Sequence, residues 1–285
     1  MLALSIGFGI ITGGVLALAA LGLSLLFRTV KFINFSYGDV LALGAYLAFF
    51  CNVTLGLPLL PAALLGMLLT GIVGVIIHKV VVKPLKEGVK AGPLTLLIAT
   101  MGVAFMIRNI ILIVWGPEPK MYNVATQEAM QIGPFLITPI QLMAILISVL
   151  IMVLIYLLLR YTQLGKMIRA TSDNIDLARV RGIRTERVIV WTWLISSGLA
   201  GLAGVMLGLM GAVDHHMGIE MLLVIFAAVI MGGIGNPYGA VAGAMIIGIA
   251  MEVSSAFGLS EYKSALAYLL MGVILLLKPK GLFAK

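Results

Sequence analysis

Long apolar runs separated by short polar stretches cover almost the whole chain. About 20 apolar residues in a helix cross the hydrocarbon core of a bilayer, and several of these runs reach that length while others fall short of it. The expected spans are residues 4–27, 40–53, 59–77, 94–114, 139–159, 188–210, 220–234, 240–257 and 265–277. The pattern predicts an all-α polytopic membrane protein with eight or nine transmembrane helices, some of them discontinuous.

The composition supports the same class. Of the 285 residues, 62% are hydrophobic and 11% are charged, with a mean hydropathy of +1.17. A soluble domain is typically about 45–50% apolar and about 25% charged, so soluble enzymes, nucleic-acid binders and secreted disulfide scaffolds are excluded. The single cysteine, Cys51, excludes an internal disulfide. The uncharged first 27 residues lack the basic start of a signal peptide, which predicts a retained first span within a single transmembrane domain over residues 1–285.

The basic residues fall in alternate loops. The net charge is +8, and basic loops remain on the cytoplasmic side of a membrane. Residues 78–90, residues 160–187 and the C-terminal tail hold most of this excess, whereas residues 115–138 and the turn at 214–216 hold little of it. The basic residues are Lys79, Lys83, Lys86 and Lys90, then Arg160, Lys166, Arg169, Arg179, Arg181, Arg184 and Arg187, then Lys278, Lys280 and Lys285. We therefore expect the two basic loops and the C-terminus to be cytoplasmic.

Two stretches, residues 31–39 and 231–239, interrupt apolar segments with polar and glycine residues. Irregular backbone at membrane depth must be buried in protein or line a cavity, and paired breaks of this kind mark the path in transporters. The residues expected to line such a path are Asn34, Ser36, Tyr37, Gly38 and Asp39 in the first stretch, and Gly235, Asn236 and Tyr238 in the second. The shared order of Asn, then Tyr-Gly, suggests a weak internal repeat. Two ordinary cytoplasmic turns are the alternative.

Ionisable residues within spans are rare and usually functional. Arg108 and Glu252 lie at similar depths near the outer ends of their spans, so a buried pair is one expectation, and snorkelling of Arg108 to the interface is the other. A row of glycines at 198, 201, 204, 208 and 211 indicates close helix packing.

Nothing in the sequence supports enzyme chemistry or a metal site. The chain has no Ser/His/Asp arrangement and no H-E-x-x-H motif, and adjacent His215 and His216 are poorly placed to share a metal. It also lacks a phosphate-binding G-x-x-x-x-G-K-[ST] loop, because Gly165-Lys166 has no upstream glycine and is followed by Met167. Any ATP-driven transport would therefore depend on a partner.

The longest polar segment, residues 160–187, contains a predicted two-turn helix. A cap at Asp173 and a stop at Gly182 bound it, with apolar positions between them. Its members are Asp173, Asn174, Ile175, Asp176, Leu177, Ala178, Val180 and Gly182. A short helix flanked by basic residues suits the docking of a cytosolic subunit, and a basic loop resting on anionic headgroups is the alternative.

Several motifs together resemble the membrane permeases of branched-chain amino acid ABC transporters, the H-type subunit more than the M-type. Residues 32–39, Phe-Ile-Asn-Phe-Ser-Tyr-Gly-Asp, are similar to the I-N-F-A-H-G-E of that family, with Tyr37 where His is common. Further matches, in the expected order, are residues 83–85, 97–102, 164–183, 199–204, 232–235 and 278–283. The resemblance covers nearly the whole chain.

The resemblance implies a permease in the cytoplasmic membrane that imports branched-chain amino acids. It implies three kinds of partner: a second, M-type permease, two cytosolic ATPases that bind ATP and Mg²⁺, and an extracytoplasmic solute-binding protein. The segment from Asp173 to Gly182 would be the coupling helix, and no cofactor would bind this chain. The alternatives are a permease for urea or amides, an ion-coupled secondary transporter with buried acidic groups such as Asp39 and Glu252, and a channel.

Overall fold

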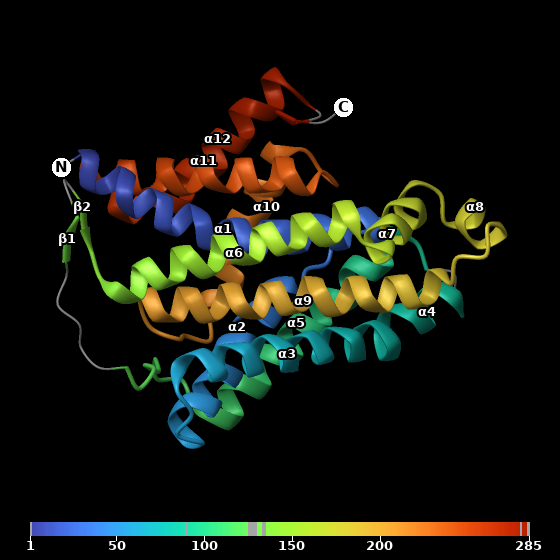
Figure 1. The fold of residues 1–285 in the computed structure, drawn as a ribbon, viewed down its shortest axis with the longest axis horizontal. Coiled ribbons are helices and arrows are strands. Elements are labelled where there is room, and N and C mark those ends of the chain that lie inside the picture. The colour runs from blue at the N-terminus through green and yellow to red at the C-terminus, as the bar shows by residue number, and fades with distance from the viewer. Residues whose placement is uncertain (1, 89–90, 125–129, 133–134, 280, 284–285) are drawn as a thin grey trace.

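Long helices lying side by side form the molecule (Figure 1). The computed structural model describes residues 2–88, 91–124, 130–132, 135–279 and 281–283. Lys90, Lys280 and Lys285 of the basic set lie outside the described residues. The helices are α1 (Leu2–Val30), α2 (Tyr37–Phe49), α3 (Leu59–Ile77), α4 (Lys83–Glu87), α5 (Pro93–Trp115), α6 (Pro139–Tyr161), α7 (Gln163–Asp173), α8 (Ile175–Val180), α9 (Thr185–Met210), α10 (Met217–Gly232), α11 (Pro237–Ala256) and α12 (Lys263–Leu277).

The expected membrane spans are confirmed. Eight helices among the described residues are long and apolar enough to cross a bilayer, and α10 is a shorter apolar helix of 16 residues. Turns of π-helix at Phe50–Thr54 and His78–Val82 extend α2 and α3, and a 3₁₀ turn at Ser260–Tyr262 precedes α12. The bundle is therefore an all-α polytopic membrane fold.

Two expected loops contain regular structure of their own. The basic segment after residue 77 continues the helical path of α3 through the π turn into α4, and Pro84 is tolerated because it lies in the first turn of α4. Strands β1 (Met130–Ile132) and β2 (Phe135–Ile137) pair antiparallel in the segment before α6. This hairpin is a small exception to the all-helical expectation.

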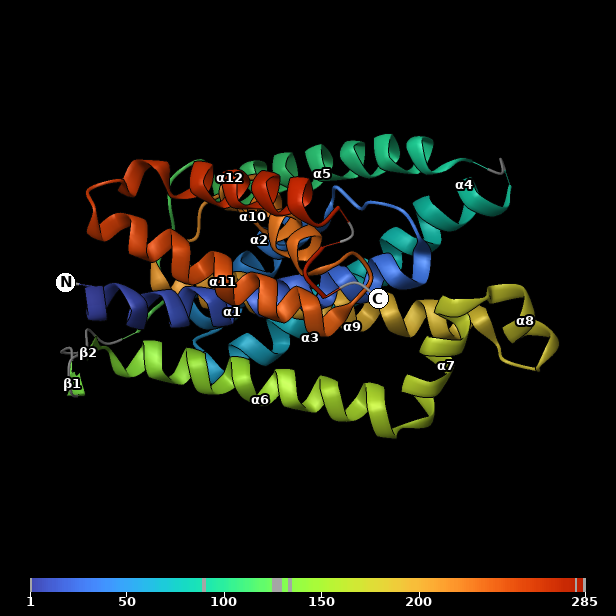
Figure 2. The same cartoon turned by 90° about the horizontal axis from the view of Figure 1, so that it is seen from above.

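Helix α1 occupies the middle of the bundle. It is buried over most of its length and packs against α6, α9, α10 and α11. Figure 2 shows α1 and α11 between α6 along one edge and α5 and α12 along the other. The outer helices α5, α6 and α12 expose most of their apolar side chains, as helices that face lipid or another subunit do.

Glycines let the central helices approach closely, which confirms the packing interpretation of the glycine row on α9. A β-carbon on Gly44 of α2 would lie 2.2 Å from the Cα of Gly201 on α9, and one on Gly204 would lie 2.1 Å from the carbonyl oxygen of Leu41. Between α1 and α11, a β-carbon on Gly248 would lie 2.3 Å from the Cα of Gly13. Contacts this short admit no side chain.

The two ends of the bundle differ in charge. Helices α4, α7 and α8, which belong to the two basic segments, lie at one end, called here the basic end, with the N-terminus and the hairpin at the other (Figure 1). At that opposite end, the backbone of Lys120 forms two hydrogen bonds with Val213, of 2.9 and 2.8 Å. The two loops that are poor in basic residues are therefore neighbours, as alternating loops should be.

Tyr122 secures the segment after α5 to the bundle. Its hydroxyl donates to the carbonyl oxygen of Ala45 at 3.0 Å, and burial raises the pKa of this hydroxyl, which keeps it protonated as a donor. The backbone N–H of Asn123 donates to the side-chain oxygen of Asn52 at 2.7 Å. These bonds hold the segment across the end of α2.

Candidate functional site

The chain between α1 and α2 enters the bundle without forming a helix. Phe35 donates its backbone N–H to the hydroxyl of Thr100 at 3.2 Å, and Thr100 lies about 10 Å along α5 from Pro93 at 1.5 Å per residue. Asn34 and Ser36 are buried, and the Asn34 oxygen accepts from the Ser36 backbone at 3.1 Å and from its hydroxyl at 2.7 Å. The first broken stretch therefore lies at membrane depth, with protein partners for its polar groups.

Tyr37 and Gly38 hold the start of α2 against its neighbours. The Tyr37 hydroxyl donates to the carbonyl oxygen of Ala19 at 2.8 Å and lies 3.3 Å from that of Ser196. A β-carbon on Gly38 would lie 2.2 Å from the carbonyl oxygen of Gly218. Tyr37 is 1% exposed, so the expectation that it faces a cavity is corrected: it fastens α2 to α1 and α9.

Asp39 and Arg108 form an ion pair inside the bundle. Arg108 on α5 donates from Nε to Oδ1 of Asp39 at 2.9 Å and from Nη2 to Oδ2 at 3.0 Å. The Asp39 carboxylate is 1% exposed and lies in the first turn of α2, where the helix dipole favours a negative charge. The guanidinium carbon also lies 5.6 Å from the ring centre of Phe105. Two parallel hydrogen bonds make this a strong, directional pair.

The expected pair between Arg108 and Glu252 is wrong. Glu252 instead accepts from Lys263 Nζ at 2.9 Å and from the Thr12 hydroxyl at 3.3 Å. The reason is helix order, because α11 packs chiefly against α1, α10 and α12, whereas α5 packs against α2. Similar depth in the membrane therefore did not bring the two residues together.

The second broken stretch is a turn at the basic end. A β-carbon on Gly235 would lie 3.8 Å from Cβ of Arg28, and Gly235 has a φ of +80°, which glycine adopts readily. The Asn236 side-chain oxygen accepts the backbone N–H groups of Tyr238 at 3.2 Å and of Gly239 at 3.3 Å, which caps α11. Its amide donates to the Phe283 carbonyl oxygen at 2.8 Å. The alternative of an ordinary turn holds here, which corrects the path-lining expectation for these residues.

The segment expected to dock a partner consists of two short helices. Asp173 is the last residue of α7, and the Asn174 oxygen caps α8 by accepting from the backbones of Asp176 and Leu177 at 3.0 Å each. Gly182 follows α8 with a φ of +83°. The helix therefore begins after Asn174 rather than at Asp173, because the extended backbone of Asn174 breaks the segment.

The exposed side of α8 carries two apolar side chains beside the charged Asp176 and Arg179. Leu177 and Val180, three positions apart, are 54% and 86% exposed, and Ile175 is half-buried. Ala178 is 3% exposed, so the expectation that this residue lies at a docking surface is wrong. The turn after α8 folds back over it, and the Ile183 N–H donates to the Ala178 carbonyl oxygen at 3.0 Å.

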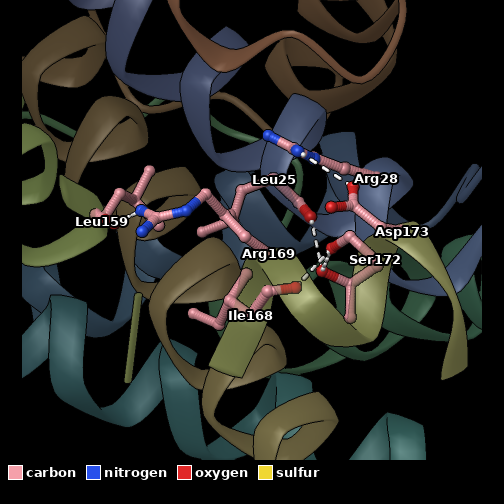
Figure 3. A network of polar contacts seen from close by, with 8 residues as sticks. Leu25, Arg28, Leu159, Ile168, Arg169, Ser172 and Asp173 are labelled. Atoms are coloured by element: carbon pink, nitrogen blue, oxygen red, sulfur yellow. Dashed lines mark hydrogen bonds and ion pairs between the residues drawn. The ribbon is translucent and has the colours of Figure 1, made fainter. Parts of the chain in front are cut away.

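Helix α7 is tied to the last turn of α1. Arg28 Nη2 lies 3.4 Å from Asp173 Oδ1, and the hydroxyls of Thr29 and Ser172 lie 3.4 Å apart (Figure 3). Each hydroxyl also donates to a carbonyl in its own helix. Arg169 reaches back to the carbonyl oxygen of Leu159, which holds α7 to the end of α6. Helix α7 therefore contacts both the last turn of the central helix and the end of α6.

The other basic segment is joined to α9 at the same end. Lys83 pairs with Glu186, and the ring of His78 stacks on Trp193 with centroids 5.5 Å apart. These partnerships, like that of Arg28 with Asp173, join residues far apart in the sequence. The sequence shows that the segments after α3 and before α9 are basic, but nothing in it predicts which of their residues contact each other.

Comparison with known proteins finds relatives over nearly the whole chain. The family model described as branched-chain amino acid transport system / permease component matches residues 5–277, from α1 to the last residue of α12. The high-affinity branched-chain amino acid transport system permease protein LivH of Escherichia coli (strain K12) is 29% identical to this chain, covering 97% of it and 94% of LivH.

Two further relatives match over similar lengths. The probable branched-chain amino acid transport permease protein LivH of Methanocaldococcus jannaschii is 30% identical, covering 96% of this chain and 90% of that protein. BraD of Pseudomonas aeruginosa, a high-affinity branched-chain amino acid transport system permease protein, is 26% identical over 97% of this chain and 94% of its own. The chain therefore belongs to the family of permease components of branched-chain amino acid transport systems.

Proposed function

We propose that this chain is a permease subunit of an ABC importer that carries branched-chain and similar hydrophobic amino acids across the cytoplasmic membrane. Family membership over nearly the whole chain and the names of the relatives support this substrate class. In this proposal the chain forms one transport domain. It works with a second permease, two cytosolic ATPases that bind ATP and Mg²⁺, and an extracytoplasmic solute-binding protein.

Two exposed apolar side chains on α8 are the observation that carries the proposal. Helix α8 extends beyond the bundle at the basic end (Figures 1 and 2), and its Leu177 and Val180 are exposed. A helix this short is marginal alone, so contact with a partner would stabilise it. An ATPase seated on this face could move α7 and, through Arg28 and Thr29, the central helix.

The orientation follows from charge. Basic segments are retained on the cytoplasmic side, which makes the basic end the cytoplasmic end. The C-terminal tail reaches the same end, because the carbonyl oxygen of Phe283 accepts from Asn236 in the turn beside Arg28. The C-terminus is therefore cytoplasmic in this proposal, and the solute-binding protein meets the opposite end.

Pairing of the buried acidic groups favours ATP-driven over ion-coupled transport. The two carboxylates singled out within the spans, Asp39 and Glu252, are each bound to a cationic side chain, Arg108 and Lys263. An ion-coupled carrier needs carboxylates that take up and release a coupling ion or proton during the cycle, and here a cationic side chain already neutralises each carboxylate.

Reconstitution tests the proposal. The permease would be purified with its partner permease and ATPases and placed in liposomes, with the solute-binding protein on the extracytoplasmic side. We expect leucine uptake that requires ATP on the cytoplasmic side and persists when ionophores collapse all ion gradients. Uptake that stops with the gradients and ignores ATP would contradict the proposal.

A further inference from the structure

A small cavity adjoins the Asp39–Arg108 ion pair. Its volume is about 210 Å³, and its apolar walls include Met101 and Phe105 of α5 and Leu222 of α10. At about 30 Å³ per water molecule this equals roughly seven waters, the size range of an amino acid with an aliphatic side chain. Asp39 and Arg108 both line this cavity.

Arg108, in the lining of the cavity, has hydrogen-bond donors that its ion pair does not use. Two of the five guanidinium N–H groups are used on Asp39, and among the described residues no other hydrogen-bond acceptor contacts Arg108. The Arg108 side chain is 12% exposed and that of Asp39 is 1% exposed, and both residues belong to the lining of the cavity. Apolar walls with a few convergent polar groups are typical of small-molecule sites.

We propose that this cavity is a transit site for zwitterionic amino acids with aliphatic side chains. The substrate carboxylate would bind the guanidinium of Arg108 and the substrate ammonium would bind the carboxylate of Asp39, with the side chain against Met101, Phe105 and Leu222. This inference rests on the proposed function and adds the residues that recognise the backbone of the substrate.

Charge balance explains why a zwitterion fits. Opening a buried ion pair leaves two uncompensated charges, which is strongly unfavourable. A zwitterion supplies one charge of each sign, so both Asp39 and Arg108 remain paired when it enters. A neutral amide or sugar cannot replace either partner, and a lipid chain would fill only the apolar part.

Photo-crosslinking of the reconstituted transporter tests this site. The probe is photo-leucine, a leucine analogue with a diazirine in its side chain, supplied with the solute-binding protein and ATP. Mass spectrometry then locates the adducts in wild-type permease, in the Asp39→Asn/Arg108→Gln double variant and in a Glu252→Gln/Lys263→Gln control. The double variants replace both charges of an ion pair with neutral amides, and assembly with the partners is checked for each.

We expect adducts on the α5 and α10 residues of the cavity that excess leucine suppresses. They should fall at least tenfold in the Asp39→Asn/Arg108→Gln variant and persist in the control. Adducts confined to other residues while leucine import continues would overturn the site, as would unchanged adducts or unchanged import in that variant. Adducts by a lipid-soluble diazirine alone would overturn it in favour of an acyl chain. A wild-type complex that imports no leucine counts against the proposed function instead.

Discussion

Arg28, near the end of the central helix, lies 3.4 Å from Asp173, the last residue of α7. Beside them the hydroxyls of Thr29 and Ser172 also lie 3.4 Å apart. Because α8 begins two residues after Asp173, this contact joins the segment that carries the exposed helix α8 to the last turn of the central helix. The link passes through side chains rather than through a rigid helix, so it can be weakened without removing either element.

Replacing Arg28 with Ala should uncouple transport from hydrolysis. The pair is partly exposed, with side chains 31% and 73% accessible, so the free energy of unfolding should change by less than about 1 kcal/mol. ATPase binding should persist, while the leucine imported per ATP hydrolysed falls. Lys263→Ala, which removes a pair at the opposite end, is the control and should keep a higher ratio. An unchanged ratio in Arg28→Ala would remove this contact from the transmission path.

Cysteine labelling should establish the orientation. Asn123 and Arg181 are exposed at opposite ends of the bundle, and Cys51, the single native cysteine, is buried. In a Cys51→Ser background, an impermeant thiol reagent outside the cell should label Asn123→Cys and fail to label Arg181→Cys. The reverse pattern would invert the proposed topology.

A side chain at the α2–α9 crossing should destabilise the bundle. Gly201 faces Gly44 and the Thr70 hydroxyl, and a β-carbon on Gly201 would lie 2.6 Å from that oxygen. Overpacking of this kind costs about 1–3 kcal/mol, so Gly201→Val should lower the thermal unfolding temperature in detergent. Gly272→Ala on α12, where no atom lies within 4 Å, should leave it unchanged or slightly higher. Equal unfolding temperatures for the two variants would contradict this packing.

The pattern of apolar and polar residues in the sequence predicted the membrane spans. It did not predict which residues the polar side chains within those spans contact. The apolar runs predict where helices lie because a bilayer demands about 20 apolar residues in each. Residues 31–39 and 231–239 share a pattern of Asn, Tyr and Gly, yet the first lies inside the bundle beside Thr100 and the second forms a turn beside Arg28. Only contacts from distant helices separate these two outcomes.

The segment from Asp173 to Gly182, which was expected to dock a partner, could also be predicted only in part. Helical spacing predicts that Leu177 and Val180 share a face that Ala178 does not, since successive residues turn by about 100°. Which face is covered depends on how the following turn and α9 fold back, and the structure covers Ala178. Arg108 shows the same limit. Its depth in the membrane could be predicted from the sequence, whereas its ion-pair partner, Asp39, depends on which helices pack against each other.

The most direct test of the account is ATPase capture by the α8 face. Val180→Glu places a charge at a position that is 86% exposed, so it should leave the permease folded and inserted. We expect ATPase co-purification and substrate-stimulated hydrolysis to fall at least tenfold, because a buried unpaired carboxylate opposes an apolar interface. Ile234→Glu, at a 51% exposed apolar position in the turn between α10 and α11, is the control and should retain ATPase binding and stimulated hydrolysis. A Val180→Glu permease that binds its ATPase and transports as well as the Ile234→Glu control would contradict the central claim.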